Sequence, residues 1–181
     1  MKPWVSGLIV IAFSGLIASN GYGKDDSIQT SKVGQLSIGK QAQSVYEIFG
    51  KKNTRVIDLS TEGEFSPAIE VFEGGIDNKR KADLIVEVTP KDSGYAIFRI
   101  RVNDQKYRLS NAVGIGSPLQ EVKTKFQDYE IVQGEGQTVL ILKGQKLSLV
   151  LDSSKIPKKY YENFDQKLLP SDLKVTQILV Y

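Results

Sequence analysis

The chain has 181 residues, of which 40% are hydrophobic and 25% are charged, and its net charge is +3. The length limits it to one domain or two small ones, and the charge is too small to indicate nucleic-acid binding, which needs a concentrated basic face. The sequence contains no His and no Cys. This excludes Ser-His-Asp and Cys-His catalysis, His-based zinc sites and thiol redox chemistry.

Residues 1–23 have the three-part pattern of a secretory signal peptide. Lys2 provides a positive start, residues 4–18 are almost wholly apolar, and small residues precede the charged run that begins at Lys24. An uncleaved membrane anchor is the alternative, but the apolar run is shorter than the roughly 20 residues of a spanning helix. We therefore expect a periplasmic or secreted bacterial protein with no transmembrane anchor after cleavage. Polar residues 24–32 are expected to form a flexible leader.

The first half, residues 33–110, is predicted to begin with a short helix. Ala42, Val45, Tyr46 and Phe49 have the spacing of one helix face, and Gly50 follows where a left-handed C-cap belongs. Apolar residues then alternate in a way typical of strands, in the segments 55–59, 68–72, 83–88 and 95–102.

The second half, residues 111–181, opens with a glycine turn and a short helix in the stretch "VGIGSPLQEVKTKF". Ser117 is the predicted N-cap, Pro118 the first helical residue, and Gln120 the partner of Ser117 in a capping box. Another short helix is predicted within 157–169. Strands are predicted in the segments 129–132, 138–143, 147–152 and 174–181.

These patterns predict an α+β fold that is rich in antiparallel sheet. It would consist of two related halves, each with a short helical lead-in followed by strands. The halves are residues 33–110 and 111–181, and one continuous domain over 33–181 is the alternative. The periodicity does not decide whether the two halves share one sheet.

The pattern "I-G-x-x-x-x-x-V-x-x-x-F" occurs once in each half, before the strands. The matched positions are Ile38, Gly39, Val45 and Phe49 in the first half and Ile115, Gly116, Val122 and Phe126 in the second. This pattern resembles the bacterial envelope modules of the BamE and β-lactamase-inhibitor-protein type, in tandem. The resemblance implies a helical lead-in packed on an antiparallel sheet and a role in binding another protein. A secreted bacterial family of unknown function with the same layout is the alternative.

Five side chains are candidate contacts for a partner. Arg99 and Arg101 alternate onto the same face of a predicted strand and, with Arg108, are suited to an anionic partner, lipid headgroups or polysaccharide. The alternative is a strand face exposed to water. Tyr160 and Tyr161 are candidate interface anchors, and the alternative is a helix packed on the sheet.

Carboxylates offer the remaining route to chemistry. Four glutamates around the second strand could provide an acid/base pair or a calcium site, although a solvated strand face explains them as well: Glu62, Glu64, Glu70 and Glu73. No EF-hand spacing is present. The glycines near residue 115 are read as a turn, because no phosphate-binding motif follows them. We therefore predict no catalytic, cofactor or metal site.

The sequence thus favours an exported, non-enzymatic protein-binding or inhibitor-like module of the bacterial envelope. Its partner would be another envelope or secreted protein. A periplasmic carrier of a small ligand or lipid is the first alternative, because the predicted strands are strongly apolar. A carboxylate-based hydrolase is the second alternative, and it requires two acids that face each other across a cleft.

Overall fold

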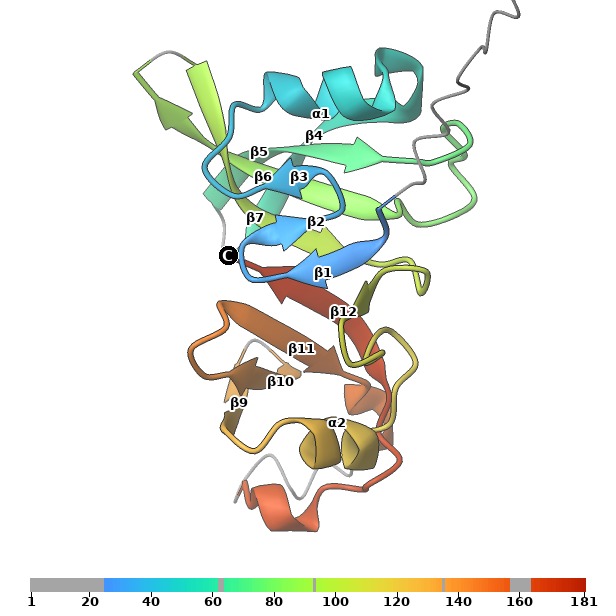
Figure 1. The fold of residues 1–181 in the computed structure, drawn as a ribbon, viewed down its shortest axis with the longest axis vertical. Coiled ribbons are helices and arrows are strands. Elements are labelled where there is room, and N and C mark those ends of the chain that lie inside the picture. Colours follow the sequence, from blue (N-terminus) through green and yellow to red (C-terminus); the bar gives the residue numbers. More distant parts are fainter. Residues whose placement is uncertain (1–24, 62–63, 93, 135, 157–163) are drawn as a thin grey trace, which may run out of the picture.

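The computed structural model describes residues 25–61, 64–92, 94–134, 136–156 and 164–181, and these form two sheets and several short helices (Figure 1). The large sheet has the order β4-β5-β6-β7-β12-β11-β10-β9, and every pair of neighbouring strands in it is antiparallel. Its strands are β4 (Thr54–Thr61), β5 (Glu64–Val71), β6 (Leu84–Lys91), β7 (Gly94–Val102), β9 (Tyr129–Gly134), β10 (Gln137–Leu142), β11 (Leu147–Leu151) and β12 (Val175–Val180). The predicted α+β fold rich in antiparallel sheet is confirmed.

The small sheet lies in front of the large one in Figure 1 and has the order β3-β2-β1-β8. Its strands are β1 (Ser27–Gln29), β2 (Lys32–Val33), β3 (Leu36–Ser37) and β8 (Arg108–Leu109). The helices are α1 (Gln43–Phe49) and α2 (Leu119–Lys125), with the 3-10 turns η1 (Lys51–Asn53), η2 (Ser153–Lys155) and η3 (Gln166–Leu168). Among the described residues, no helix is long and apolar enough to cross a bilayer.

The strand order of the large sheet is mirrored about its centre. Residues 54–102 supply four consecutive strands on one side, and residues 129–180 supply four on the other. The two sets meet where β7 pairs with β12, with Ile100 opposite Val180 and Val102 opposite Ile178. The strands of both halves therefore belong to one continuous sheet.

One face of the large sheet, here called the inner face, carries the core. Val45 of α1 and Val122 of α2 are fully buried in the same hydrophobic cluster as the strand residues. One row of paired positions crosses the whole inner face: Thr54, Val71, Leu84, Val102, Ile178, Leu149, Leu140 and Ile131. Side chains alternate between the faces of a strand, so the positions between these form the outer face.

Each helix is preceded by a glycine turn that hydrogen-bonds to a central strand. The Gly39 N–H donates to the carbonyl of Ile97 at 2.7 Å, and the Gly116 N–H donates to the carbonyl of Val175 at 2.8 Å. The two glycines have φ angles of 83° and 87°. Such angles are accessible to glycine at little cost, so both turns depend on a residue without Cβ.

Both central strands also contain a β-bulge. In β7 the pairing with β6 shifts between Glu87 and Val88, which leaves Phe98 as the extra residue. In β12 the pairing with β11 shifts between Val150 and Leu151, which leaves Thr176 as the extra residue. A bulge increases the local twist, so the two halves twist at matching places.

The predicted capping role of Ser117 is wrong. The residue before α2 is Pro118, and no side chain caps the helix. Ser117 is buried, and its hydroxyl accepts a hydrogen bond from the Gly114 N–H at 3.2 Å. Its own carbonyl accepts from the Val175 N–H. This residue is therefore held by the pairing with β12 before the helix begins.

The segment expected to be a flexible leader contains β1. Ile28 in this strand is 1% exposed and pairs with Leu109 of β8 in a parallel register. Burial of Ile28 in the common core explains why residues 25–32 are fixed against the rest of the molecule. The predicted signal peptide, residues 1–23, and residues 157–163 of the predicted C-terminal helix lie outside the described residues.

Candidate binding groove

A groove of about 450 Å³ lies on the inner face between α1 and the ends of the β4–β5 and β6–β7 hairpins. Val56, Ile69 and Val88 of three neighbouring strands line it, together with Ala42 and Tyr46 beside them. The groove is lined mainly by apolar groups, and none of the described residues that line it is charged. Pockets with these properties are typical of sites that bind apolar ligands or side chains.

Large apolar side chains remain exposed along the groove. Val56 is 64% exposed and Tyr95, which also lines the groove, is 46% exposed. Phe65 is 74% exposed and pairs with Ser60, which places it on the same sheet face beyond the groove. Contiguous exposed apolar side chains often mark an interaction site.

The groove is bordered by β4, an edge strand of the large sheet. Within the described part of the chain, β4 pairs with β5 and with no other strand. Its eight residues contain neither Pro nor Lys, with which proteins often protect an edge, although Arg55 and Asp58 are charged. The groove therefore lies next to backbone groups that are available for pairing.

The matching position in the other half of the sheet is closed. Counted from the two bulges, Val86 corresponds to Leu149, and strand pairing then matches Ile69 to Leu140 and Val56 to Ile131. There the edge strand is β9, and Ile131 on its inner face is only 5% exposed. The connection between β11 and β12 places Ile156, Phe164 and Leu169 against the core, and Phe164 lies beside Ile131. In the first half only two residues separate β6 from β7, so within the described part of the chain no segment equivalent to the β11–β12 connection covers Val56.

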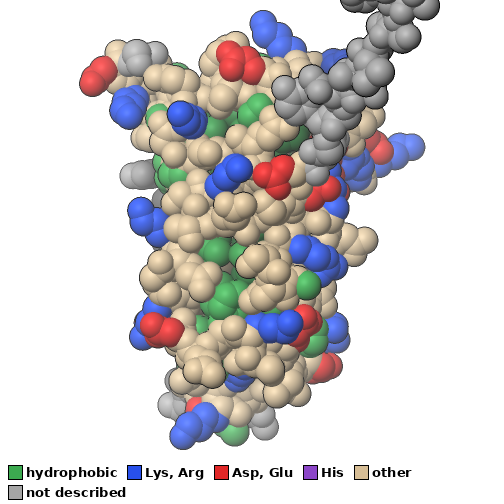
Figure 2. Space-filling model, viewed as in Figure 1, with side chains coloured by type: hydrophobic (Ala, Val, Ile, Leu, Met, Phe, Trp, Pro, Cys, Tyr) green, Lys and Arg blue, Asp and Glu red, His purple; other side chains and the backbone are tan. Residues whose placement is uncertain are grey.

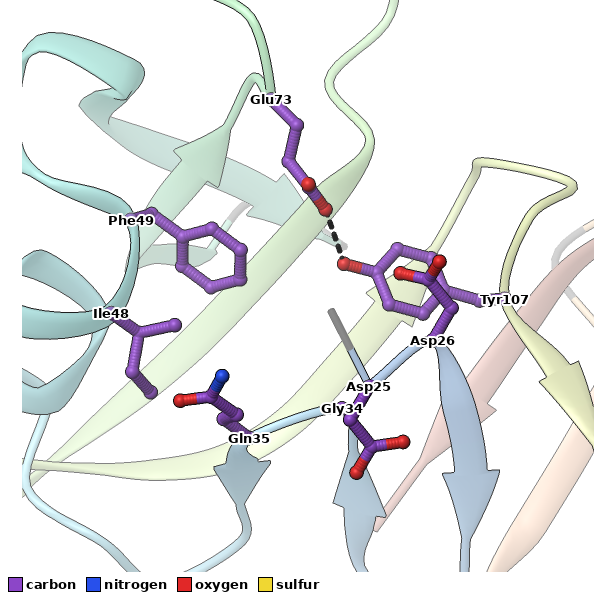
Figure 3. Close-up of a pocket in the computed structure, with 8 residues that line it drawn as sticks. All are labelled: Asp25, Asp26, Gly34, Gln35, Ile48, Phe49, Glu73 and Tyr107. Carbon is purple, nitrogen blue, oxygen red and sulfur yellow. Dashed lines mark hydrogen bonds between the residues drawn. The ribbon is translucent and has the colours of Figure 1, made fainter. Parts of the chain in front are cut away.

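A second, more polar pocket of about 250 Å³ lies between α1 and β1 (Figure 3). Ile48 and Phe49 form its apolar side, while Asp25, Asp26 and Glu73 bring three carboxylates to its other side. We call it the acidic pocket. It brings Glu73, one of the four glutamates singled out in the sequence, close to two aspartates of the N-terminal segment.

The carboxylates of the acidic pocket are engaged with neighbouring groups. Glu73 accepts a hydrogen bond from the hydroxyl of Tyr107 at 2.5 Å and forms an ion pair with Lys106. Burial, reinforced by Glu73, raises the pKa of Tyr107 above its ordinary value. Hydrogen bonds from Ser27 lower the pKa of Asp25. Glu73 is thus bonded to a tyrosine hydroxyl and a lysine, whereas a glycosidase places a protonated acid and a second carboxylate on either side of the scissile bond.

Among the described residues, no group of three or more acidic side chains has a geometry that would hold a metal ion. Of the four glutamates singled out in the sequence, Glu73 lies in the acidic pocket and Glu70 pairs with Arg55 at 2.6 Å. The side chains of Glu62 and Glu64 lie outside the described residues.

The structure brings Arg99 and Arg101 together on the outer face, where both contact the carboxylate of Glu87. It does not bring Arg108 to them, because Arg108 belongs to β8 of the small sheet and donates to the carbonyl of Ala112 at 3.0 Å. Tyr160 and Tyr161 lie outside the described residues. On the side that carries the small sheet, Lys and Arg side chains are dispersed and do not form one patch (Figure 2).

Sequence reasoning missed Glu87 and the groove. Glu87 occupies a polar position of an alternating strand, where a solvent-exposed residue is expected. Only the register of the β6–β7 hairpin places it opposite Arg99. The groove depends on the absence of a covering segment, which no local pattern reveals. Phe65 was the available signal, since it is an aromatic residue near the start of β5, two positions before Pro67.

The fold and the groove together define a mostly-β α+β protein with an open apolar site on one sheet face. No protein-family model matches the sequence, and no curated protein matches it. The fold is similar to the crystal structure of the uncharacterized protein yfeY from Escherichia coli, with a TM-score of 0.53 and 19% sequence identity. The similarity covers 85% of this chain and 97% of that chain. At this level of identity the similarity shows the fold alone.

Proposed function

We propose that this chain is an exported, non-enzymatic binding module whose groove receives an apolar segment of another envelope or secreted protein. The observation that carries the proposal is the contrast between Val56, which is 64% exposed, and Ile131, which is 5% exposed at the matching sheet position. The chain covers Ile131 with its own residues, so a partner segment of similar character would cover Val56. Removing such apolar area from water contributes roughly 25 cal/mol per Å².

We also propose that the two halves are related copies of one unit. The mirrored strand order, the matching φ angles of Gly39 and Gly116 and the two bulges at Phe98 and Thr176 support this relation. A tandem module of the BamE or β-lactamase-inhibitor-protein type would have this organisation. In this view the groove is the site that one copy leaves open and the other closes internally.

Export is part of the proposal and is supported by the signal-peptide pattern of residues 1–23. The proposed location is the bacterial periplasm or the cell exterior.

A carrier of a small apolar ligand or lipid is the second candidate function. It is favoured by the volume of the groove, about 450 Å³, which falls within the roughly 300–1,000 Å³ typical of small-molecule sites. The two functions differ in what accompanies the protein when it is purified.

Affinity capture from the producing cell's envelope, followed by native mass spectrometry, tests the proposal. The bait is the full-length protein, compared with a Val56→Ser/Phe65→Ser double variant. The control is Leu168→Ser, which removes a similarly exposed apolar side chain, 55% exposed, from η3. We expect one partner protein to be recovered with the wild type and the control, and to be lost with the double variant.

A small-molecule mass on the wild type, lost in the double variant and without a protein partner, would favour the carrier. Recovery of the same proteins by all three baits would contradict the proposed groove.

A further inference from the structure

The outer face of the large sheet carries a buried carboxylate held by two arginines. Glu87 is 2% exposed although it lies on the outer face, between Ala68 and Arg99 in the strand register. Arg99 donates to both of its oxygens, from Nε at 2.7 Å and from Nη2 at 2.6 Å. Arg101 donates to Oε1 of the same carboxylate through Nε.

The arginines exceed the carboxylate in both charge and donors. Two guanidinium groups share one carboxylate, so the cluster of Glu87, Arg99 and Arg101 has a net charge of +1. Within the described part of the chain, neither terminal nitrogen of Arg101 has a hydrogen-bond partner, because its single hydrogen bond comes from Nε. Its side chain is only 24% exposed, so these donors are fixed near the sheet surface.

The sheet itself does not require this cluster. Glu87 lies beside the β6–β7 bulge and pairs with Arg99. In the other half, the residue beside the β11–β12 bulge is Val150, which pairs with Gln177. Val150 is 6% exposed, so an apolar side chain fills the same kind of site. Since a buried ion pair is weak evidence for stability, the charged cluster is better explained by recognition.

We infer that the terminal nitrogens of Arg101 bind the carboxylate of an acidic side chain on a protein partner. A planar carboxylate matches the two parallel donors of a guanidinium. The single excess positive charge balances a monoanion, and the nearby Glu87 disfavours the dianionic phosphate group. Ile85 and Leu179 flank Arg101 in the register and are half-buried. They would pack against an apolar residue next to the acid.

This site is separate from the groove, which opens on the inner face. A partner that uses both would have to reach around the edge of the sheet, so we treat the carboxylate site as an independent contact.

The test is a titration of the full-length, 15N-labelled protein with acetyl-Leu-Glu-Leu-amide, followed through the guanidinium resonances of Arg101. Matched titrations use acetyl-Leu-Gln-Leu-amide, inorganic phosphate and phosphatidylglycerol vesicles. We expect saturable shifts with the Glu peptide and roughly tenfold weaker binding of the Gln peptide, the size expected for loss of one charge-assisted hydrogen-bond pair. Phosphate and vesicles should bind more weakly than the Glu peptide.

Variants locate the site. Because a variant at position 101 lacks the Arg101 resonances, the variants are followed through the backbone amides of Ile85 and Leu179, which flank this position. Arg101→Gln should abolish the shifts of these amides, Arg101→Lys should weaken binding by keeping the charge without the planar donors, and Arg108→Gln should leave binding unchanged. Equal binding of the two peptides to the wild type overturns the proposal, and this comparison does not depend on how any variant folds. Tighter binding of phosphate or vesicles, or an equal loss of binding in Arg101→Gln and Arg108→Gln, overturns it as well.

Discussion

Glu87 shows how one buried acid can organise the outer face. Burial acts to raise the pKa of this carboxyl group, but hydrogen bonds from Arg99 and Arg101 outweigh that effect and hold the pKa below its usual 4.5. The group is therefore ionised at neutral pH, and it fixes both arginines. Arg99 also lies over the rings of Phe98, at 5.4 Å, and Tyr181, at 6.0 Å. Arg99 of β7 thus contacts both Glu87 of β6 and Tyr181, the residue that follows β12.

Replacing Glu87 by Gln is expected to lower the free energy of unfolding by about 2 kcal/mol at pH 7, since two partly buried guanidinium groups lose their charged partner. Because the folded pKa of Glu87 is depressed, its contribution is present above pH 4.5 and is lost as the pH falls through the folded value. Urea denaturation of both proteins from pH 3 to 7 should therefore give curves that converge in acid.

Glu70→Gln is the matched control for this prediction. Glu70 lies on the same face and pairs with Arg55, but its side chain is 15% exposed against 3% for Glu87. Its loss should cost less than about 1 kcal/mol. Two outcomes would show that the ionised Glu87 carboxylate is not the source of the stabilisation. One is an equal effect of the two substitutions on the free energy of unfolding, and the other is a difference between wild type and Glu87→Gln that persists at pH 3.

At the scale of elements, the two glycine turns position the helices. Gly39 and Gly116 each pair with a central strand, and α1 and α2 begin a few residues later. A Cβ at either position would meet no atom within 4 Å. The constraint is therefore the backbone angle alone, and both turns should respond alike to substitution.

Gly39→Ala and Gly116→Ala are each expected to lower the free energy of unfolding by about 1–2 kcal/mol, because a residue with a Cβ is strained at positive φ. Gly134→Ala is the control, since it also has open space around its Cβ position but no positive φ. It should change the stability by less than about 0.5 kcal/mol. Chemical denaturation of the three variants measures this, and a difference above 1 kcal/mol between the two turns would argue that they are not equivalent.

The sequence predicted elements well where a pattern is local. Alternating residues located the strands of both halves, and the run from Lys174 to Tyr181 contains β12. Local patterns failed where distant pairing decides the outcome. Ser117 has the residue type and spacing of an N-cap. Its carbonyl, however, accepts a hydrogen bond from the Val175 N–H, which pairs this residue with β12 instead. The polar segment around Ile28 has no strand-like alternation, and it becomes β1 because β8 and the core lie beside it.

The candidate sites were less accessible to prediction than the fold. The alternation of Arg99 and Arg101 predicted a shared face, which the structure has. Their partner Glu87 required the hairpin register, including a bulge that shifts it by one residue. The groove required knowledge of which connection folds back over the sheet. That information is spread over residues 152–174 and cannot be read near Val56.

At the scale of the whole molecule, the two halves are joined at several places. β7 and β12 pair through three residues on each strand. A second link is the antiparallel bridge between Arg108 of β8, at the end of the first half, and Gly114, in the second half. The Ser31 hydroxyl also donates to the carbonyl of Tyr181 at 2.8 Å. One hydrophobic cluster includes buried residues of both halves, so we expect them to unfold together.

Ile178→Ala tests this cooperativity at the junction. Ile178 is fully buried and pairs with Val102 on one side and Leu149 on the other. Its truncation should cost about 2–4 kcal/mol through lost burial and the cavity that remains. Because the core is continuous, hydrogen exchange should accelerate by a similar factor in the amides of β6 and β10, which lie in different halves. Acceleration confined to β9–β12 would instead mean that the halves open separately, and the single sheet would then be two folding units joined at β7 and β12.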